Sequence, residues 1–509
     1  MKPTLHFGGE TTPADVFFAR CGRAAAALHA CGIGERDVFA LMLRNEPVTL
    51  ELILAGRWLG ARWCMINWHF KAHEVRHILA DSGAKVLVVH ADLLEAIAAS
   101  IPPGVKVFVV APEAATRTAF RLGQGPWPAA QGASDWAQFR DATPHPPAAQ
   151  SAPGSAMLYT SGTTGLPKGI ARDAATPEQV QATLQISRVV LGVEPAMRAV
   201  VSAPLYHAAP MSYVVLASLS DADLWIAPRF DAERTLQLIH EHRITHAYLV
   251  PTMYVRLLAL PEAVRARYDL RSMRFVASTG SPCPPQVKRA MIDWWGPVIT
   301  ECYGASELGF MTRLTSEQAL RKPGSAGLPM PGVTLAILDD DGRPLPTGKA
   351  GLIYVDQPAT PDFSYIGNPE ARQRMAVGAL KTLGDIGYLD EDGYLFIVDR
   401  KADMVISGGV NIYPVEIENV LLAMPGIADC AVFGIPDDEF GESLAAAVQP
   451  LPGAEVSAEA VRGFVQQRLA GYKVPKVVTL HEALPREETG KIFKRRLREG
   501  YWVGRERRV

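Results

Sequence analysis

Strand-like and helix-like segments alternate through the first four hundred residues, and this alternation limits the fold more than any other feature. Residues 85–89 (KVLVV) and 105–110 (VKVFVV) are short β-branched runs of the kind that parallel sheets bury. The segment from Thr12 to Asp15 is typical of a helix start, with a hydroxyl cap, a proline and an acid, and Gly32 is placed to end the helix. The pattern predicts an α/β fold of layered subdomains rather than a sandwich or a helical bundle.

Two later regions depart from this alternation. Residues 111–155 are rich in Ala, Pro and Gln and show little periodicity, which predicts a long surface excursion. From residue 333 onward, Asp341-Gly342 and Asp392-Gly393 each separate two apolar runs. Both pairs are typical of tight turns, so this part of the chain is expected to form hairpins and a β-barrel-like region.

The pattern changes again after Arg400. Helix-like and strand-like segments follow one another near 417–424, 428–434, 443–449, 457–469 and 475–480. They predict a small α+β unit of about 110 residues. We therefore expect a large domain over residues 1–399, a boundary at 399–402, and a small domain over 400–509.

Composition excludes several classes of protein. The chain has 509 residues, and 51 basic against 53 acidic residues give a net charge of −2, which offers no global attraction for nucleic acid or an anionic membrane. The six cysteines are scattered and form no CxxC pair, as in a reducing compartment. We find no secretory leader, membrane span or lipidation box. The expectation is a cytoplasmic protein without nucleic-acid or integral membrane association; its oligomeric state, a homodimer included, stays open.

The stretch from Tyr159 to Gly169 (YTSGTTGLPKG) carries the most chemical information. Its three glycines permit close backbone approach, four hydroxyls supply donors, and Lys168 supplies positive charge, a combination that suits a polyphosphate. A Ser/Thr/Gly surface turn is the alternative. The spacing is not that of a P-loop NTPase, because glycine rather than Ser or Thr follows Lys168.

This loop resembles the signature of the adenylate-forming superfamily, which includes acyl- and aryl-CoA synthetases, nonribosomal-peptide adenylation domains and firefly luciferase. Four further motifs follow in the family's order, at residues 301–307 (ECYGASE), 383–385 (LGD), 399–418 and 485–492. Ser306 replaces the usual threonine of the motif at 301–307, and Leu383 replaces the usual threonine of the motif at 383–385. The resemblance spans about residues 12–498, and motif order identifies the chain as a member of the adenylate-forming superfamily; the acid–CoA ligase branch is the leading interpretation.

The resemblance implies a two-step reaction. A carboxylate attacks the α-phosphorus of ATP to give an acyl-adenylate, and the thiol of CoA then displaces AMP. The expected ligands of the β- and γ-phosphates are Thr160, Ser161, Gly162, Thr163, Thr164, Gly165 and Lys168. Glu307, with Thr160, is the expected Mg²⁺ ligand, since hard cations take oxygen donors. The adenosine is expected to contact Tyr303 and Gly280, Ser281, Pro282, Glu301, Cys302, Gly304 and Ser306.

The remaining motifs imply the parts that act after ATP binds. Asp385 has two oxygens suited to the ribose hydroxyls, and Arg400 is expected near the ribose or phosphates. Lys491 is the expected catalytic cation for adenylation, delivered by a mobile small domain that then rotates. Gly408 and Gly409 would line the pantetheine path in the second state. The family usually has Asp or Lys at the hinge, where this chain has Ala402.

The segment from Pro204 to Met211 (PLYHAAPM) resembles the wall of the family's acyl tunnel. His207 stands at the histidine position that gates the acyl site, and it is the third candidate catalytic residue beside Glu307 and Lys491; a structural histidine is the alternative. The other expected wall residues are apolar, small or aromatic, namely Tyr206, Tyr213, Met253, Gly280, Ala305 and Met311. Because none is cationic, a dicarboxylate ranks low, and a fatty or bulky aryl or steroid-like acid is expected.

Three other functions compete with this interpretation. An acyl-AMP ligase could load a carrier protein instead of CoA, and a luciferase-like monooxygenase would share the same motifs. A nucleotide-binding sensor without catalysis would fit a decayed hinge at Ala402. Retention of Lys168, Glu307, Asp385 and Lys491 favours an active ligase over the sensor.

Overall fold

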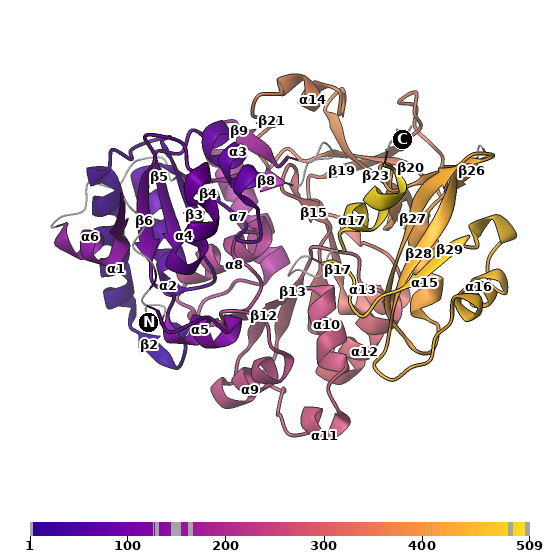
Figure 1. Ribbon diagram of the computed structural model, residues 1–509, viewed down its shortest axis with the longest axis horizontal. Helices are drawn as coiled ribbons and strands as arrows, with labels where there is room; N and C mark the ends of the chain where they lie inside the picture. The colour runs from indigo at the N-terminus through magenta and orange to yellow at the C-terminus, as the bar shows by residue number, and fades with distance from the viewer. Residues whose placement is uncertain are drawn as a thin grey trace. The chain divides into compact units, whose positions relative to one another are not determined.

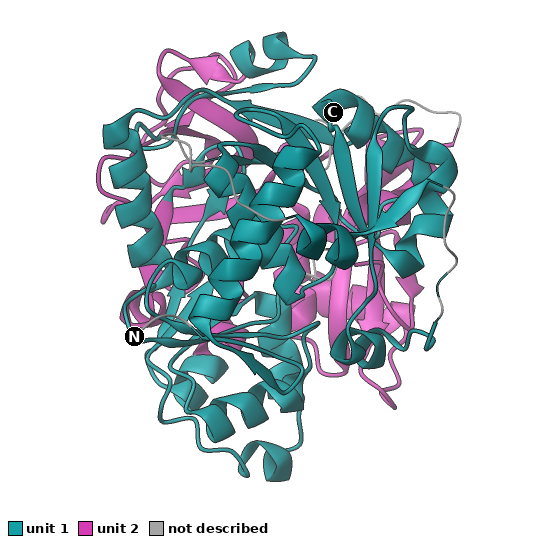
Figure 2. Ribbon diagram, turned by 90° about the vertical axis from the view of Figure 1, so that its left-hand side faces the viewer, with its two compact units in different colours: residues 1–279, 290–311, 357–374 teal, residues 280–289, 312–356, 375–509 magenta. Residues whose placement is uncertain are grey.

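The computed structural model describes residues 4–125, 127, 132–143, 154–160, 166–408, 410–486 and 492–503. Contacts divide the chain into two compact units (Figure 2). The first unit comprises residues 1–279, 290–311 and 357–374, and the second comprises 280–289, 312–356 and 375–509. The boundary expected at 399–402 stays a prediction, because a division by contacts need not fall at the pivot of a rotation.

The first unit contains an eight-stranded sheet with the order β21-β9-β8-β4-β3-β5-β6-β7. Its strands are β3 (Val38–Met42), β4 (Arg62–Met65), β5 (Val86–His90), β6 (Lys106–Val110), β7 (Ala133–Asp135), β8 (Ser155–Thr160), β9 (Lys168–Arg172) and β21 (Phe363–Tyr365). Pairing is parallel from β8 to β7, whereas β9 is antiparallel to both of its neighbours. Both predicted β-branched runs are strands, and β5 is buried along its length, as expected for a covered parallel sheet.

Seven neighbouring strands of a second, nine-stranded sheet lie in this unit, in the order β14-β13-β12-β10-β11-β1-β2. These strands are β1 (Leu5–Phe7), β2 (Glu10–Thr12), β10 (Arg198–Val201), β11 (Asp223–Ile226), β12 (His246–Leu249), β13 (Phe275–Ser278) and β14 (Ile299–Glu301). Only β2 runs antiparallel to its partner. The carboxyl edges of such sheets are where α/β proteins bind ligands, and the expected acyl and adenine segments follow β10, β12 and β14.

Helices of the first unit alternate with these strands (Figure 1). They include α1 (Ala14–Ala30), α2 (Pro47–Leu59), α3 (Ala72–Ser82), α4 (Ala91–Ile97), α7 (Pro177–Leu191), α8 (Ala208–Ser218), α9 (Ala232–His242), α10 (Pro251–Leu258) and α11 (Glu262–Arg265). Helix α1 begins at Ala14 and lacks the expected hydroxyl cap, because Thr12 pairs with Leu5 in the sheet. The alternation confirms the predicted α/β class.

The second unit is built mainly from antiparallel strands. A five-stranded sheet contains β19 (Thr334–Leu338), β20 (Gly351–Asp356), β22 (Ala376–Val377), β23 (Leu380–Leu389) and β24 (Leu395–Arg400), and both predicted hairpins are present in it. The smaller sheet contains β25 (Val405–Ser407), β26 (Val410–Ile412), β27 (Ile427–Asp437), β28 (Gly441–Pro450) and β29 (Val477–Leu480). Helices α15 (Pro414–Leu422) and α16 (Ala458–Gln466) pack on it around a shared apolar core, which confirms the predicted order of elements after residue 400.

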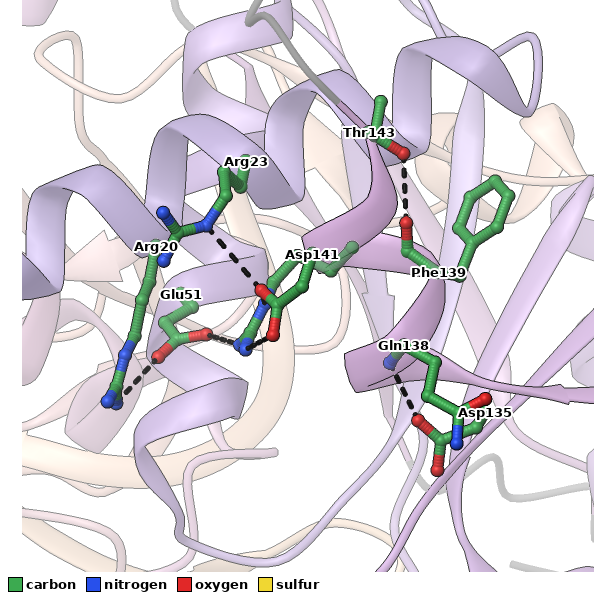
Figure 3. Close-up of polar contacts among 9 residues, drawn as sticks. Arg20, Arg23, Glu51, Asp135, Gln138, Phe139, Asp141 and Thr143 are labelled. Atoms are coloured by element: carbon green, nitrogen blue, oxygen red, sulfur yellow. Dashed lines mark hydrogen bonds and ion pairs between the residues drawn. The ribbon is translucent and has the colours of Figure 1, made fainter.

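The stretch 111–155, predicted to be a long surface excursion, contains regular secondary structure in the part that the structure describes. It contains α5 (Ala114–Phe120), β7 and α6 (Trp136–Ala142), and α6 lies beside α1 (Figure 1). Arg140 of α6 donates a hydrogen bond of 2.8 Å to the carboxylate of buried Glu51 on α2. Arg23 of α1 forms an ion pair with Asp141 at 3.5 Å (Figure 3). These partners lie far away in sequence, so the local composition gave no sign of the helix.

Two general features agree with the composition. All six cysteines are buried, and none of them forms a disulfide bond. Within the ranges described above, no helix combines the length and apolar character that a bilayer crossing needs.

Candidate active site

The glycine-rich loop joins two antiparallel strands, β8 and β9. Thr160, the last residue of β8, pairs directly with Lys168, the first residue of β9. Ser161, Gly162, Thr163, Thr164 and Gly165 lie outside the described residues, and their phosphate contacts stay predictions. A Cβ on Gly169 would lie 2.8 Å from the Tyr159 ring, so a side chain there would require that ring to shift.

Glu307 lies at the tip of a narrow hairpin. The hairpin pairs β15 (Gly304–Ala305) with β16 (Gly309–Phe310), leaving three residues in the turn. A Cβ on Gly304 would lie 2.8 Å from the carbonyl oxygen of Gly309, and Gly309 has a φ of +71°. Glycine at both positions therefore permits the close turn that carries the Glu307 carboxylate, which is only 9% exposed.

Two hydroxyls from different strands meet at this carboxylate. Oε1 of Glu307 accepts hydrogen bonds from Oγ1 of Thr160 at 3.3 Å and from the hydroxyl of Tyr365 at 3.2 Å. Burial and the adjacent carboxylate raise the pKa of Tyr365, which keeps its phenol protonated as a donor. The Nζ atom of Lys168 lies 5.6 Å from the centre of the Tyr365 ring. The fold thus brings three predicted residues, Thr160, Lys168 and Glu307, into one cluster.

Two members of this cluster were absent from the sequence prediction. Tyr365 belongs to β21, which pairs with β9 through Tyr365 and Ile170. Arg172 donates hydrogen bonds to the carbonyl oxygens of Ser306 and Pro361, so it anchors the turn that carries Glu307. Burial lowers the pKa of Arg172, and the Glu307 carboxylate opposes that effect. Strand alternation places Lys168 and Arg172 on one face of β9, a signal that was available for Arg172, whereas no local pattern marks Tyr365.

The oxygen donors fit a magnesium ion held mainly by its nucleotide. One carboxylate and one hydroxyl, from Glu307 and Thr160, match the hard oxygen ligands that Mg²⁺ prefers. In the part of the chain that the structure describes, no group of three or more His, Cys, Asp or Glu side chains could form a protein cage for a metal. Such a site would leave the remaining positions to phosphate oxygens and water.

Asp385 and Arg400 lie opposite each other in the antiparallel pair of β23 and β24. The Nε atom of Arg400 lies 3.1 Å from Oδ1 of Asp385, so the expected ribose ligand already has a cationic neighbour. Asp385 is buried, whereas the side chain of Arg400 is 55% exposed. Because the Arg400 guanidinium is already exposed to water, it can turn toward an incoming anion without breaking buried contacts.

The residues expected to contact the adenosine are divided between the two units. Glu301 ends β14, Cys302 is buried directly after it, and Tyr303 accepts from the backbone N–H of Met311 at 2.9 Å; Ser306 is in the Glu307 turn. The second unit contributes the other expected residues, Gly280, Ser281 and Pro282. The wall that these sets would form together stays a prediction.

Lys491 and Gly409 lie outside the described residues. The chain on either side of the lysine loop is fixed, because Arg486 pairs with Ile492 in an antiparallel bridge and Phe493 N–H donates to Pro485 at 2.8 Å. Gly408 has a φ of +57°, and a Cβ there would lie 3.0 Å from the Phe440 ring. The catalytic and pantetheine-binding roles of this part stay predictions.

Residues of the expected acyl wall follow the carboxyl ends of neighbouring strands. His207 directly precedes α8, and its ring centre lies 4.4 Å from that of Tyr206. The buried members are Tyr206, Tyr213 on α8, Met253 on α10 and Met311, whereas Ala305 is half-buried in β15. Gly280 belongs to the second unit. The first-unit members are therefore mostly buried and uncharged, and the acyl tunnel that they would line stays a prediction.

Comparison with known proteins agrees with this geometry. The family model described as AMP-binding enzyme matches residues 2–361, and the model of the AMP-binding enzyme C-terminal domain matches residues 416–491. Long-chain-fatty-acid–CoA ligase FadD13 of Mycobacterium tuberculosis is 34% identical over 95% of this chain and 92% of its own length. Feruloyl-CoA synthase of an Amycolatopsis species is 33% identical with the same coverage.

A solved structure gives the same result for the fold. The crystal structure of ATP-bound MatB from Rhodopseudomonas palustris superposes with a TM-score of 0.83 at 28% identity, covering 98% of this chain and 96% of the other. The match extends through both a large N-terminal and a smaller C-terminal part, as the sequence predicts. The chain belongs to the AMP-binding enzyme family and is an AMP-forming acid–CoA ligase of the adenylate-forming superfamily.

Proposed function

We propose that this enzyme converts a long-chain or bulky apolar carboxylic acid to its CoA thioester through an acyl-adenylate. The observation that carries the proposal is the convergence of Glu307, Thr160 and Lys168 at the end of the β8–β9 hairpin. The substrate class is supported by the uncharged first-unit wall residues. A second carboxylate placed among them would lose its hydration without gaining a cationic partner, at a cost of several kcal/mol.

The residues of the cluster would neutralise and position the triphosphate. Lys168 supplies a point charge for the departing pyrophosphate, and the Thr160 hydroxyl donates a hydrogen bond beside it. Bound Mg²⁺ would withdraw negative charge from the phosphate oxygens. Arg172 and Tyr365 would keep the Glu307 carboxylate in place, so that no reorganisation is needed when charge develops.

The second unit would supply the remaining groups. Asp385 would accept hydrogen bonds from the ribose hydroxyls, with Arg400 turned toward the phosphates. Lys491 would approach the carboxylate and the α-phosphate during adenylation and withdraw before the thiol attacks. Positioning of the two anions against each other accounts for most of the chemistry, since no side chain needs to become covalently attached.

Acid-dependent release of pyrophosphate tests the proposal. The purified enzyme is assayed with ATP and a library of C2 to C16, aryl and steroid acids, with and without CoA. We expect pyrophosphate only with long or bulky apolar acids, and AMP together with acyl-CoA only when CoA is present as well. A preference for acetate or malonate would overturn the substrate class. Transfer to a carrier protein in place of CoA would reassign the acceptor, and nucleotide turnover without AMP would overturn the reaction.

A further inference from the structure

Asn45 lies outside every predicted motif, yet it is buried and links the end of β3 in one sheet to the segments that follow β10 and β11 in the other. We propose that Asn45 is a positioning residue for acid selection, because it fixes the backbone that carries Tyr206 and His207. The inference rests on the acyl-binding role proposed for those two residues. It adds a determinant that lies 160 residues earlier in the chain.

The side-chain amide of Asn45 binds the main chain on both sides of Pro204. Its Nδ2 donates to the carbonyl oxygen of Ala203 at 3.0 Å, and its Oδ1 accepts from the N–H of Leu205 at 3.0 Å. The same Nδ2 donates to the carbonyl oxygen of Ala227 at 3.2 Å. Asn45 is 1% exposed, so these bonds are formed away from water. Both amide hydrogens and one oxygen lone pair are therefore used by main-chain groups.

This arrangement replaces a missing strand partner. Strand β10 ends at Val201, and the chain beyond it is still buried at Ala203 and Leu205. Buried N–H and C=O groups need partners, and Pro204 between them has no N–H to offer. One amide satisfies both neighbours at once, as an adjacent strand would. A bond from His207 N–H to the carbonyl oxygen of Pro204, at 3.2 Å, closes the turn. The position of His207 is thus set two residues after the Asn45 contact.

The residue before Asn45 supports the same segment through side chains. The guanidinium of Arg44 lies 4.7 Å from the centre of the Phe120 ring and is held by two bonds to Asp92, at 2.9 and 2.7 Å. Phe120 packs edge-on against Trp68, whose ring centre lies 6.2 Å away. Trp68 in turn meets Tyr206 edge-on at 4.6 Å. The loop after β3 therefore reaches Tyr206 by a chain of ring contacts and His207 by the backbone.

The consequence should be specific to the acid. The three hydrogen bonds of Asn45 described above go to segments after β10 and β11, whereas the residues of the Glu307 cluster come from β8, β9, β21 and the turn after β15. Misplacement of a positioned group by about 1 Å can cost roughly a hundredfold in rate. Removal of the amide should therefore change how acids are distinguished while ATP binding is retained.

Matched variants test the proposal in the full-length enzyme. Asn45→Ala removes all three bonds, and Asn45→Asp keeps the size but places an oxygen against two carbonyl groups. Thr49→Val is the control, because Thr49 is equally buried in the same region and its hydroxyl donates to Arg44 O at 2.7 Å. The readouts are kcat and KM for ATP, kcat/KM for a preferred and a poor acid, and the melting temperature. Asn45→Ser, which retains a hydroxyl, is used should the alanine variant fail to fold.

We expect both Asn45 variants to lower kcat/KM for the preferred acid by about tenfold or more and to compress the ratio between the two acids, with KM for ATP within about twofold. Thr49→Val should lower the melting temperature and leave the acid ratio unchanged. An unchanged acid ratio in folded Asn45 variants, or an equal shift in Thr49→Val, would overturn the inference. Absence of acid-dependent turnover in the unaltered enzyme would instead overturn the proposed function, so the two failures are distinguishable.

Discussion

Asp399 provides a stability prediction whose sign and size follow from its surroundings. The residue lies near the carboxyl end of β24 and is 4% exposed. Its Oδ1 accepts from the N–H of Arg400 at 2.8 Å and its Oδ2 from the N–H of Val415 at 3.1 Å. Burial nevertheless raises the pKa of Asp399 to about 6 from 3.8, because Lys494 and the two backbone bonds only partly compensate for lost hydration.

A raised carboxyl pKa means that the folded chain holds its proton longer than the unfolded chain does. Protonated Asp399 therefore contributes its full stabilisation to the folded state below about pH 4, and this contribution is lost as the pH rises through about 6. The full loss is about 3 kcal/mol for a shift of roughly two pKa units. Between pH 5 and pH 7 the same linkage gives about 1.3 kcal/mol, or roughly 1 °C in melting temperature for a 509-residue chain that unfolds as one unit.

Comparison with Asp399→Asn isolates this effect. The asparagine does not titrate, and the bond that it loses shifts its stability by a constant amount at every pH. Melting temperatures of both proteins are measured between pH 5 and 7.5 in one ionic strength. We expect the unaltered protein to lose stability relative to the variant as the pH rises. Parallel curves, or a relative gain with rising pH, would refute the reasoning.

Three further predictions concern the second unit. Lys494→Met should lower the urea unfolding free energy by about 1–3 kcal/mol, because it removes the ammonium group 2.9 Å from half-buried Glu418 and leaves that carboxylate with the N–H of Val432, whereas Arg495→Met, which breaks an exposed ion pair, should change little. Ala402→Pro should impair thioester formation from isolated acyl-adenylate more than pyrophosphate release, and equal loss in both half-reactions would contradict a hinge. Gly408→Ala should slow the thioester step more than Gly441→Ala. Both glycines have a positive φ, but an added Cβ would crowd the Phe440 ring only at position 408. Equal effects of the two substitutions would indicate backbone strain alone.

Local patterns were sufficient to predict much of the fold. The β-branched runs at 85–89 and 105–110 are both strands; β5 is buried along its length, whereas in β6 only Phe108 is buried, so β propensity and not burial on both faces is the shared signal. The Asp-Gly turns near 341 and 392 are equally local. Helix α6 escaped prediction because its stability comes from partners such as Glu51, which lies 89 residues from Arg140. Composition in a short window carries no record of such partners.

The candidate site divides in the same way. Motif order predicted Thr160, Lys168 and Glu307, and the structure brings them together across 147 residues of sequence, from Thr160 to Glu307. Their catalytic roles stay predictions. Tyr365, Arg172 and Asn45 carry no motif in the sequence interpretation, because each acts through a main-chain or side-chain partner chosen by strand pairing.

A physical distinction separates these two groups of residues. Groups that would meet the substrate keep fixed chemical types at fixed spacing, since phosphate, ribose and carboxylate impose the same demands in every member of a family. Groups that hold them in place need only satisfy a buried carbonyl, amide or carboxylate, and many side chains at many chain positions can do that. Asn45 and Arg172 are of the second kind. Differences in acid preference between relatives of similar motif content should therefore be sought first in such supporting residues.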